Sequence, residues 1–597
     1  MTYEKMQIMD EIESLPEGYI SNKKINGKLR HYRQWNEDGK LKSKYIPDSE
    51  YESVKQGIER RRELQTVLKS AGIEYRTRRS GMDFETAVFT GDDLRSCTAG
   101  AAALERRECF ANLQKYLEMP FEPRIMAVFG LRRTGKTTLL FQAAAGLDRE
   151  KFDRAAYIKA RKGQNMYMLD RDLKKLKSLG YTYVFIDEIT FLDDFIDTAS
   201  MLSDVYAATG MKIIISGTDS LGIWLAEREE LYDRVYTVHT TWIPFREHSR
   251  LLGTDDIDDY IRYGGTLRAG ETAFGDPALR SEDISFRDDE STRRYIDTAI
   301  CKNIQHSLSS YENGSRFMHL QELYDAGELT GAINRIIESM NHRFVLKVLT
   351  ENFRSNDLQL ARRNLLRERD EQKRSDALDH IELQSVTERL MEILEIRNRS
   401  DRSVKLTDAH VREIREYLKA LDLIEASPVV YASGTETPGE NILIMQPGMR
   451  YCQAQALVWS LTQDSYFSGI PETEKEYVSE KILTEVRGRM LEEIILIETA
   501  RTAGNGRRAF KYQFPGGEID MIVYDSRSAS CRLYEIKHST EAVREQCAHL
   551  LDEEACRQIE YIYGSIVQKS VIYRGRTFTS ADGVEYINAS EYLKNLA

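Results

Sequence analysis

Residues 130–138 have the composition and spacing of a loop that binds phosphate groups. The segment reads GLRRTGKTT, follows the apolar run 125–129 and precedes the helix-like run 139–145. Its glycines let backbone N–H groups turn toward phosphate oxygens, and a helix N-terminus adds positive partial charge. Lys136 would reach the β- and γ-phosphates, and the Thr137 hydroxyl would bind Mg²⁺. The residues predicted to bind nucleotide are Gly130, Leu131, Arg132, Arg133, Thr134, Gly135, Lys136, Thr137 and Thr138.

Two carboxylates after a second apolar run could serve hydrolysis of a bound nucleotide. Residues 183–186 read YVFI and are followed by Asp187 and Glu188. Asp187 would hold Mg²⁺, directly or through water, and Glu188 would polarise the attacking water. The alternative is a strand end that carries two solvated acids. The distance along the chain from Lys136 suits a later element of the same domain and favours the catalytic interpretation.

A third apolar run, 212–215, ends in small polar residues between Ser216 and Ser220. In AAA+ ATPases the corresponding strand end carries a polar side chain that contacts the γ-phosphate or the attacking water. Thr218 is the candidate here, with Ser216 and Asp219 as its neighbours. An ordinary polar junction between strand and loop is the alternative.

The order of these motifs resembles bacterial and archaeal AAA+-like ATPases that carry a separate C-terminal domain of unknown function. The matching segments are 217–220 (GTDS), 231–234 (LYDR), 243–247 (IPFRE) and 260–265 (YIRYGG). Asp233 stands where the family has glycine, and a Leu-Ser pair expected between Pro244 and Phe245 is missing. The resemblance makes Arg234 a candidate for neutralising phosphate charge, within one subunit or across two. A surface arginine paired with a neighbouring acid is the alternative.

The C-terminal segments resemble the same family's domain of the PD-(D/E)xK nuclease type, with Ile519 in place of the proline. Glu492 lies in a helix-like stretch, Asp520 in the strand-like run 517–523, and Glu535 and Lys537 in the run 533–537. Residues two apart on a strand share a face, so Glu535 and Lys537 point the same way. Asp520 and Glu535 would share Mg²⁺ or Mn²⁺, Lys537 would position water, and Glu492 would approach from the helix. A nuclease-like fold that only binds is the alternative.

Between these two regions the pattern predicts a winged helix, which the family also has at this place. Residues 376–394 are helical by periodicity, Thr407 could cap a second helix, and short apolar runs near 423–444 would form the wing. Such helices bind DNA. This one carries mixed charge, so an intramolecular spacer or regulatory role is an equal alternative. The basic residues on it are His410, Arg412, Arg415 and Lys419.

The N-terminal segment 18–46 carries eight basic and two acidic residues, with tyrosines and a tryptophan between them. Turn signals at Asn26-Gly27 and Asp38-Gly39 predict a three-stranded meander, and a basic helix follows near 58–69. It resembles small N-terminal modules of bacterial and mobile-element proteins. Bases and aromatic rings on a small sheet suit nucleic-acid binding. A solvated face over an aromatic core is the alternative.

Length and charge bound the remaining possibilities. The chain has 597 residues and a net charge of −12, and no apolar run approaches a membrane span. The N-terminus lacks a secretory pattern and the seven cysteines are scattered, so we expect reduced thiols and a cytoplasmic protein without membrane contact. The expected domains are a basic module (1–75), a linker (76–103), a P-loop ATPase core (104–250), a helical lid (251–375), a winged helix (376–450) and a nuclease-like domain (451–597).

Together these observations predict an α/β protein with a parallel AAA+-like P-loop sheet, a helical lid, a winged helix and a restriction-endonuclease-like C-terminal domain. The predicted function is an ATPase that uses ATP and Mg²⁺ and is coupled to a nucleic-acid-directed domain, with DNA the favoured partner. AAA+ relatives often form rings, so a homo-oligomer is also considered. The alternatives are a nucleotide-dependent switch, or a DNA-binding regulator whose nuclease fold is inactive.

Overall fold

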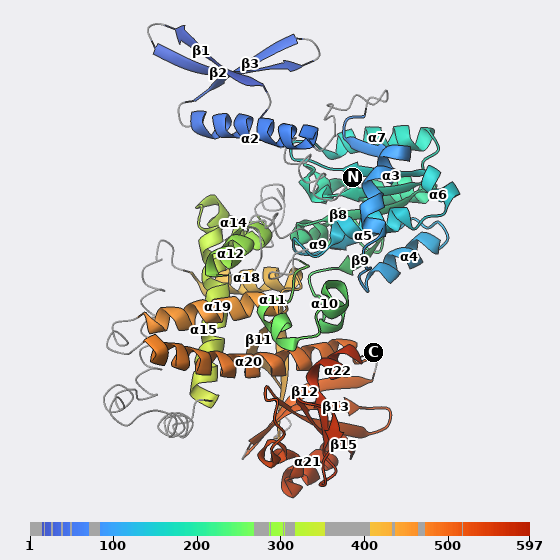
Figure 1. The fold of residues 1–597 in the computed structure, drawn as a ribbon. Coiled ribbons are helices and arrows are strands. Elements are labelled where there is room, and N and C mark those ends of the chain that lie inside the picture. The colour runs from blue at the N-terminus through green and yellow to red at the C-terminus, as the bar shows by residue number, and fades with distance from the viewer. Residues whose placement is uncertain are drawn as a thin grey trace. The chain divides into compact units, whose positions relative to one another are not determined.

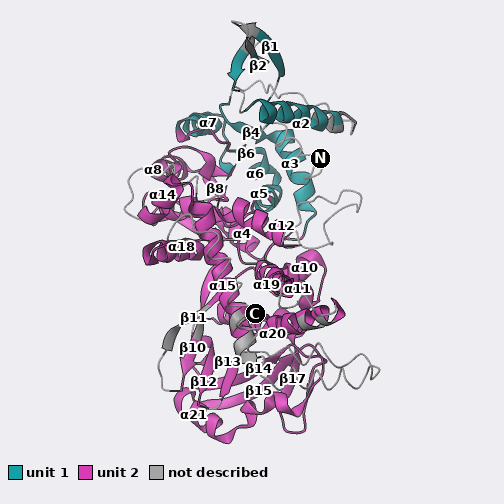
Figure 2. Cartoon of the chain, turned by 90° about the vertical axis from the view of Figure 1, so that its left-hand side faces the viewer, with its two compact units in different colours: residues 1–104, 138–159, 167–185 teal, residues 105–137, 160–166, 186–597 magenta. Residues whose placement is uncertain are grey.

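The computed structural model describes most of the chain, and many of its elements are labelled in Figure 1. The described residues are 15–16, 18–25, 28–37, 40–47, 50–70, 84–267, 286, 288–301, 304, 317–352, 406–432, 436–463, 472–504, 506–515 and 517–596. The helix expected at 376–394 lies outside them. The chain divides into two compact units, residues 1–104, 138–159 and 167–185 in one and residues 105–137, 160–166 and 186–597 in the other (Figure 2).

The N-terminal meander forms as predicted. β1 (Tyr19–Ile25), β2 (Lys28–Glu37) and β3 (Lys40–Ile46) make an antiparallel sheet in chain order. Helix α2 (Tyr51–Ser70) follows and begins earlier than expected.

A six-stranded sheet carries the phosphate-binding loop. Its strand order is β4-β6-β7-β8-β5-β9, and β5 pairs in parallel with both β8 and β9. β5 and β8 are buried along their whole length, which explains their continuous apolar sequences. The strands are β4 (Ala87–Thr90), β5 (Ile125–Phe129), β6 (Ala155–Lys159), β7 (Tyr183–Asp187), β8 (Lys212–Gly217) and β9 (Val235–His239). Helices beside them are α3 (Gly91–Ala102), α4 (Phe110–Glu118), α5 (Lys136–Ala145), α6 (Arg149–Asp153), α7 (Met166–Ser178), α8 (Phe195–Thr198) and α9 (Ser220–Arg228).

The expected linker at 76–103 is corrected by the structure over its described part. Residues 87–90 form β4, which pairs antiparallel with β6, and residues 91–102 form α3. Asp172 fixes the entry to β4, because its carboxylate accepts bonds from the N–H of Glu85 and from the N–H and hydroxyl of Thr86. The small residues that suggested a linker instead allow a helix to pack closely, and Ala101 is buried.

An eight-stranded sheet occupies the C-terminal part, in the order β11-β10-β12-β13-β14-β15-β17-β16. The strands expected to form a wing join it, because β10 pairs in parallel with β12. The strands are β10 (Ile424–Tyr431), β11 (Glu436–Ile444), β12 (Arg507–Phe514), β13 (Gly517–Asp525), β14 (Ser530–Lys537), β15 (Ser565–Tyr573), β16 (Phe578–Thr579) and β17 (Glu585–Asn588).

Within the larger unit, helices lie between β9 and the C-terminal sheet along the chain. Thr407 caps α18 as predicted: its hydroxyl accepts the His410 N–H. α20 spans 31 residues along the C-terminal sheet (Figure 1). The remaining helices are α10 (Phe245–Leu252), α11 (Ile257–Tyr263), α12 (Asp289–Tyr295), α14 (Met318–Asp325), α15 (Leu329–Asn352), α18 (Asp408–Ala420), α19 (Pro447–Thr462), α20 (Glu472–Thr502), α21 (Glu553–Tyr563) and α22 (Ala589–Lys594). In the described part of the chain, no helix combines the length and apolarity that a membrane crossing needs.

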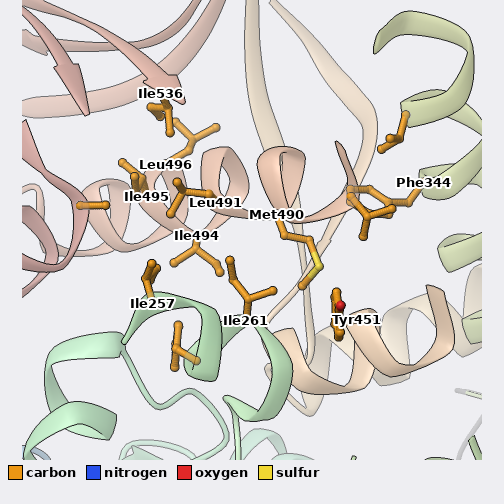
Figure 3. Close-up of a cluster of buried hydrophobic side chains, with 14 of the residues drawn as sticks. Ile257, Ile261, Phe344, Tyr451, Met490, Leu491, Ile494, Ile495, Leu496 and Ile536 are labelled. Carbon is orange, nitrogen blue, oxygen red and sulfur yellow. The ribbon is translucent and has the colours of Figure 1, made fainter. Parts of the chain in front are cut away.

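An apolar cluster packs α11 against α20 and the C-terminal sheet (Figure 3). Ile257 and Ile261 come from α11, Leu491 and Ile494 from α20, and Ile536 from β14. All five side chains are buried, so the cluster stabilises the contact between the two helices through the hydrophobic effect.

Glu498 is a buried acid that ties α20 to the start of α10. Its Oε1 accepts the Phe245 N–H at 2.7 Å, and the Tyr260 hydroxyl, which donates to the Ile243 carbonyl at 2.7 Å, lies nearby. Burial raises the pKa of Glu498 to about 8. The folded protein therefore holds this carboxyl in its neutral form at pH 7.

This raised pKa predicts a pH-dependent stability difference between wild type and Glu498→Gln. A raised folded-state pKa stabilises fully below the ordinary pKa of 4.5, and the contribution is lost as pH rises through about 8. Glutamine keeps the acceptor and does not titrate. The melting temperature of wild type, followed by calorimetry, should therefore fall relative to that of Glu498→Gln between about pH 5 and 9. Exposed Glu541→Gln is the control, and a constant offset between wild type and Glu498→Gln would contradict the assignment.

Candidate nucleotide site and a second acidic site

The phosphate-binding loop folds tightly between β5 and α5. Gly130 has φ 148° and Gly135 has φ 87°, values that favour glycine. A Cβ on Gly130 would lie 2.5 Å from the Thr240 Oγ1, so a side chain there would collide with the segment after β9. Lys136 Nζ donates to the carbonyls of Gly130 at 2.9 Å and Leu131 at 2.8 Å. The lysine thus lies across the loop whose backbone would hold the phosphates.

The structure brings Thr137 and Asp187 together at the end of β7. Thr137 Oγ1 donates to Asp187 Oδ2 at 2.9 Å, and Ser216 Oγ donates to the other carboxylate oxygen. Hydroxyl and carboxylate oxygens are the donors that Mg²⁺ prefers. The pair therefore fits the ion that the sequence predicts, and Ser216 emerges as the residue that orients Asp187.

Glu188 and Thr218, the candidate base and the candidate polar contact, are also neighbours. Glu188 adopts a left-handed backbone conformation with φ 57°. Its Oε2 accepts the Thr218 hydroxyl at 2.9 Å and the Thr218 N–H at 3.2 Å. Asp219 serves differently, because its carboxylate caps α9 by accepting the Gly222 N–H. Thr218 therefore fixes the carboxylate that would polarise water.

Arg234 pairs with a neighbouring acid at the surface, which is the alternative to a role in neutralising phosphate charge. Its Nε lies 3.0 Å from Asp204 Oδ1, and its Nη1 donates to the Glu230 carbonyl at 2.9 Å. Its side chain is substantially exposed. In this structure Arg234 is an arginine paired with a neighbouring acid.

Arg107, which was not predicted from the sequence, binds the phosphate-binding loop to the segment after β9. Its guanidinium donates to the carbonyls of Thr134 at 2.8 Å, Thr240 at 2.7 Å and Trp242 at 2.8 Å, and to both carboxylate oxygens of Glu247 at 2.9 and 3.1 Å. Arg107 is 6% exposed and Glu247 2% exposed. The acid in the segment 243–247 was the available signal, since a buried glutamate needs a cationic partner.

The second acidic site lies on β13, β14 and α20. Lys537 Nζ donates to Asp520 Oδ2 at 2.9 Å and to Glu535 Oε2 at 2.7 Å, so the predicted trio is assembled. Burial works against ionisation of Asp520, but the charges of Lys537 and Lys511 and the Ile536 N–H hold its pKa below the usual range. Burial, reinforced by the charge of Asp520, raises the pKa of Glu535.

Glu492 joins this site with three residues that sequence reasoning did not select. One oxygen from each of Glu492, Glu518 and Asp520 lies within 4.8 Å of the others, a spacing that a hard cation could bridge. Lys511 Nζ lies 2.6 Å from Glu518 Oε1, and Arg489 Nη1 donates to Glu492 Oε2 at 2.6 Å. The carboxylate oxygens that lie close enough to bind one cation therefore come from Asp520, Glu492 and Glu518. Glu535, the second metal ligand expected from the sequence, is instead joined to Asp520 through Lys537.

Comparisons with known proteins bear on two segments. Residues 122–249 match the family model described as AAA domain, and residues 3–56 match one described as a domain of unknown function, DUF6788. No curated protein matches the chain.

Two solved structures share 14% sequence identity with this chain. The Aeropyrum pernix ORC1 protein in complex with DNA covers 62% of this chain and 96% of its own, with a TM-score of 0.22. C. elegans PCH-2 covers 40% and 63%, with a TM-score of 0.18. The loop geometry and the AAA domain match at residues 122–249 support a P-loop ATPase domain of the AAA+ type.

Proposed function

We propose that this chain hydrolyses ATP at residues 130–138 and that its nucleotide state controls a metal-dependent, nucleic-acid-directed site at Asp520. The observation that carries the ATPase part is the double pairing at the ends of β7 and β8. Thr137 meets Asp187 on the side expected for Mg²⁺, and Thr218 meets Glu188 on the side expected for water. A site that only bound nucleotide would not need the second carboxylate.

In the proposed hydrolysis, the loop and the residues at the ends of β7 and β8 have separate roles. Backbone N–H groups of the loop and Lys136 bind the phosphates, and Thr137 and Asp187 hold Mg²⁺, which neutralises phosphate charge when bound. Glu188 orients the attacking water and accepts its proton. Thr218 positions Glu188 through the hydrogen bond between them.

The segment 257–267 supports coupling between the two sites, since it contacts the phosphate-binding loop at one end and the residue that follows Lys537 at the other. At one end the Leu267 N–H donates to the Arg133 carbonyl in the phosphate-binding loop at 3.0 Å. At the other, Asp258 lies 2.6 Å from His538 Nε2 and 2.7 Å from Arg574. His538 directly follows Lys537. A shift of the phosphate-binding loop on ATP binding would therefore move residues 257–267 and, through Asp258, the end of β14.

At the second site, the proposed chemistry is metal-dependent phosphodiester cleavage of DNA. Asp520, Glu492 and Glu518 would hold the metal ion, which would polarise the scissile phosphate. Lys537 would orient the attacking water or stabilise developing charge. Glu535 keeps Lys537 in place through its 2.7 Å contact.

A second candidate function is nucleic-acid binding without cleavage. Three buried or half-buried cations, Lys511, Lys537 and Arg489, already pair with the four carboxylates of this site. Such compensation stabilises the site without a metal ion. In this case the ATPase would act as a nucleotide-dependent switch.

The ATPase proposal predicts that Glu188→Gln lowers ATP turnover by about 100-fold or more, because the amide cannot accept a proton. ATP binding should persist, since the phosphate contacts come from the loop. Phosphate release and binding of a fluorescent ATP analogue measure the two effects. Exposed Glu150→Gln is the matched control. Full turnover by Glu188→Gln would show that another residue activates the water.

The cleavage proposal predicts that wild type cuts labelled DNA in Mg²⁺ or Mn²⁺ and that Lys537→Ala loses about 100-fold or more of the rate. ATP turnover by the variant should remain normal, which separates the two sites. Lys569→Ala, on neighbouring β15, is the control. If wild type turns over ATP and cuts neither single- nor double-stranded DNA, the switch function replaces the nuclease.

A further inference from the structure

The N-terminal sheet presents rings and cations together on one face. In the antiparallel register Tyr32 lies opposite Tyr45 on β3, and Lys23 lies opposite Arg30. Because side chains two apart along a strand share a face, Tyr19, Lys23, Arg30, Tyr32 and Tyr45 all lie on one side. We call these five residues the tyrosine face.

Contacts within the tyrosine face hold the rings and the cations side by side. The rings of Tyr32 and Tyr45 meet edge to face at 5.6 Å between centroids. Lys23 Nζ lies 5.2 Å from the Tyr32 ring centroid, and Arg30 Cζ lies 5.9 Å from that of Tyr45. Tyr32 and Tyr45 therefore each have a positive charge beside the ring, and the pairing of the strands places these side chains together.

The opposite side of the sheet turns toward α2. The His31 ring lies 4.0 Å from that of Tyr51, the first residue of α2, and Ile46 on the same side is buried. On the tyrosine face, Tyr19 is 46% exposed and Tyr45 44% exposed. Tyr19 and Tyr45 are thus open to solvent, and Tyr32 between their strands is half-buried.

We propose that the tyrosine face binds single-stranded DNA. Unpaired bases stack on exposed aromatic rings, whereas the base faces of a duplex are already stacked on one another. Phosphates would meet Lys23 and Arg30, and the surrounding segment 18–46 has a net charge of +6 in a chain of −12. DNA is the occupant to which we commit because the proposed function at Asp520 is directed at DNA, and RNA is the competing strand in the test.

The test measures binding of a fluorescent oligo(dT) of about 15 nucleotides to the full-length chain by anisotropy, in EDTA and without nucleotide. These conditions silence cleavage and keep the ATPase site empty. Wild type should bind the single strand at least tenfold more tightly than a duplex of the same length. Tyr32→Ala/Tyr45→Ala should weaken binding at least tenfold, and Tyr32→Phe/Tyr45→Phe should restore it, since stacking needs only the ring.

Two matched double variants distinguish binding by the tyrosine face from non-specific attraction of DNA to the basic sheet. Lys23→Ala/Arg30→Ala removes one cross-strand basic pair from the face, and Arg33→Ala/Lys44→Ala removes another from the opposite side. The first should weaken binding and lower the slope of log K against log salt by about 1.4, from two phosphate contacts. The second should change binding by less than about threefold.

Four outcomes would overturn the proposal. These are unchanged binding by Tyr32→Ala/Tyr45→Ala, equal weakening by the two basic double variants, equal affinity for the duplex, and tighter binding of oligo(rU) than of oligo(dT). Circular dichroism of each variant establishes that the module remains folded. Because Lys23→Ala/Arg30→Ala tests the same face without removing a ring, a misfolded Tyr32→Ala/Tyr45→Ala variant does not protect the proposal.

Discussion

The buried ion pair between Arg107 and Glu247 is the interaction on which the nucleotide site depends. Removing two charges from water is costly unless every donor and acceptor is satisfied, and here the guanidinium donates to three backbone carbonyls as well as to the carboxylate. Glu247 also accepts the Glu108 N–H at 2.9 Å. The pair thereby joins the phosphate-binding loop, the segment after β9 and helix α10. Loss of one partner would leave the other charge buried and would release all three at once.

Buried contacts also join α10 to the helices beside the C-terminal sheet. The first N–H of α10 is bound by neutral Glu498 of α20, and α11 packs its isoleucines on α20 while Asp258 binds His538. Buried apolar side chains and a few polar contacts thus both join these elements. These contacts give the proposed coupling a physical route: the elements that contact the phosphate-binding loop also contact the strand that carries Lys537.

The features that could be predicted from the sequence are those that depend on residues close together in the chain. The glycines and Lys136 predict a phosphate-binding loop. Asp187 is predicted from the apolar run before it and its distance from Lys136, and Thr218 from the strand end that corresponds to a polar contact in AAA+ ATPases. The capping Thr407 and the meander at 18–46 follow from short-range chemistry in the same way. The roles of Arg107 and Lys511 were not predicted, because their acidic partners lie on other elements. Arg489 pairs with Glu492 on its own helix, and the sequence did not show that this pair lies beside Glu518 of β13. The parallel pairing of β10 with β12 and the folding of 84–103 depend likewise on long-range packing.

The central claim is that nucleotide at the loop alters the acidic site through residues 257–267. Hydrogen exchange measured by mass spectrometry on Glu188→Gln, with and without ATP and Mg²⁺, tests it most directly, because that variant should retain ATP. The account predicts slower exchange at 130–138 together with changed exchange at 257–267 and 517–537, and loss of the change at 517–537 in the added variant Asp258→Asn. Protection confined to 130–138, with the other two segments unaffected, would contradict the coupling.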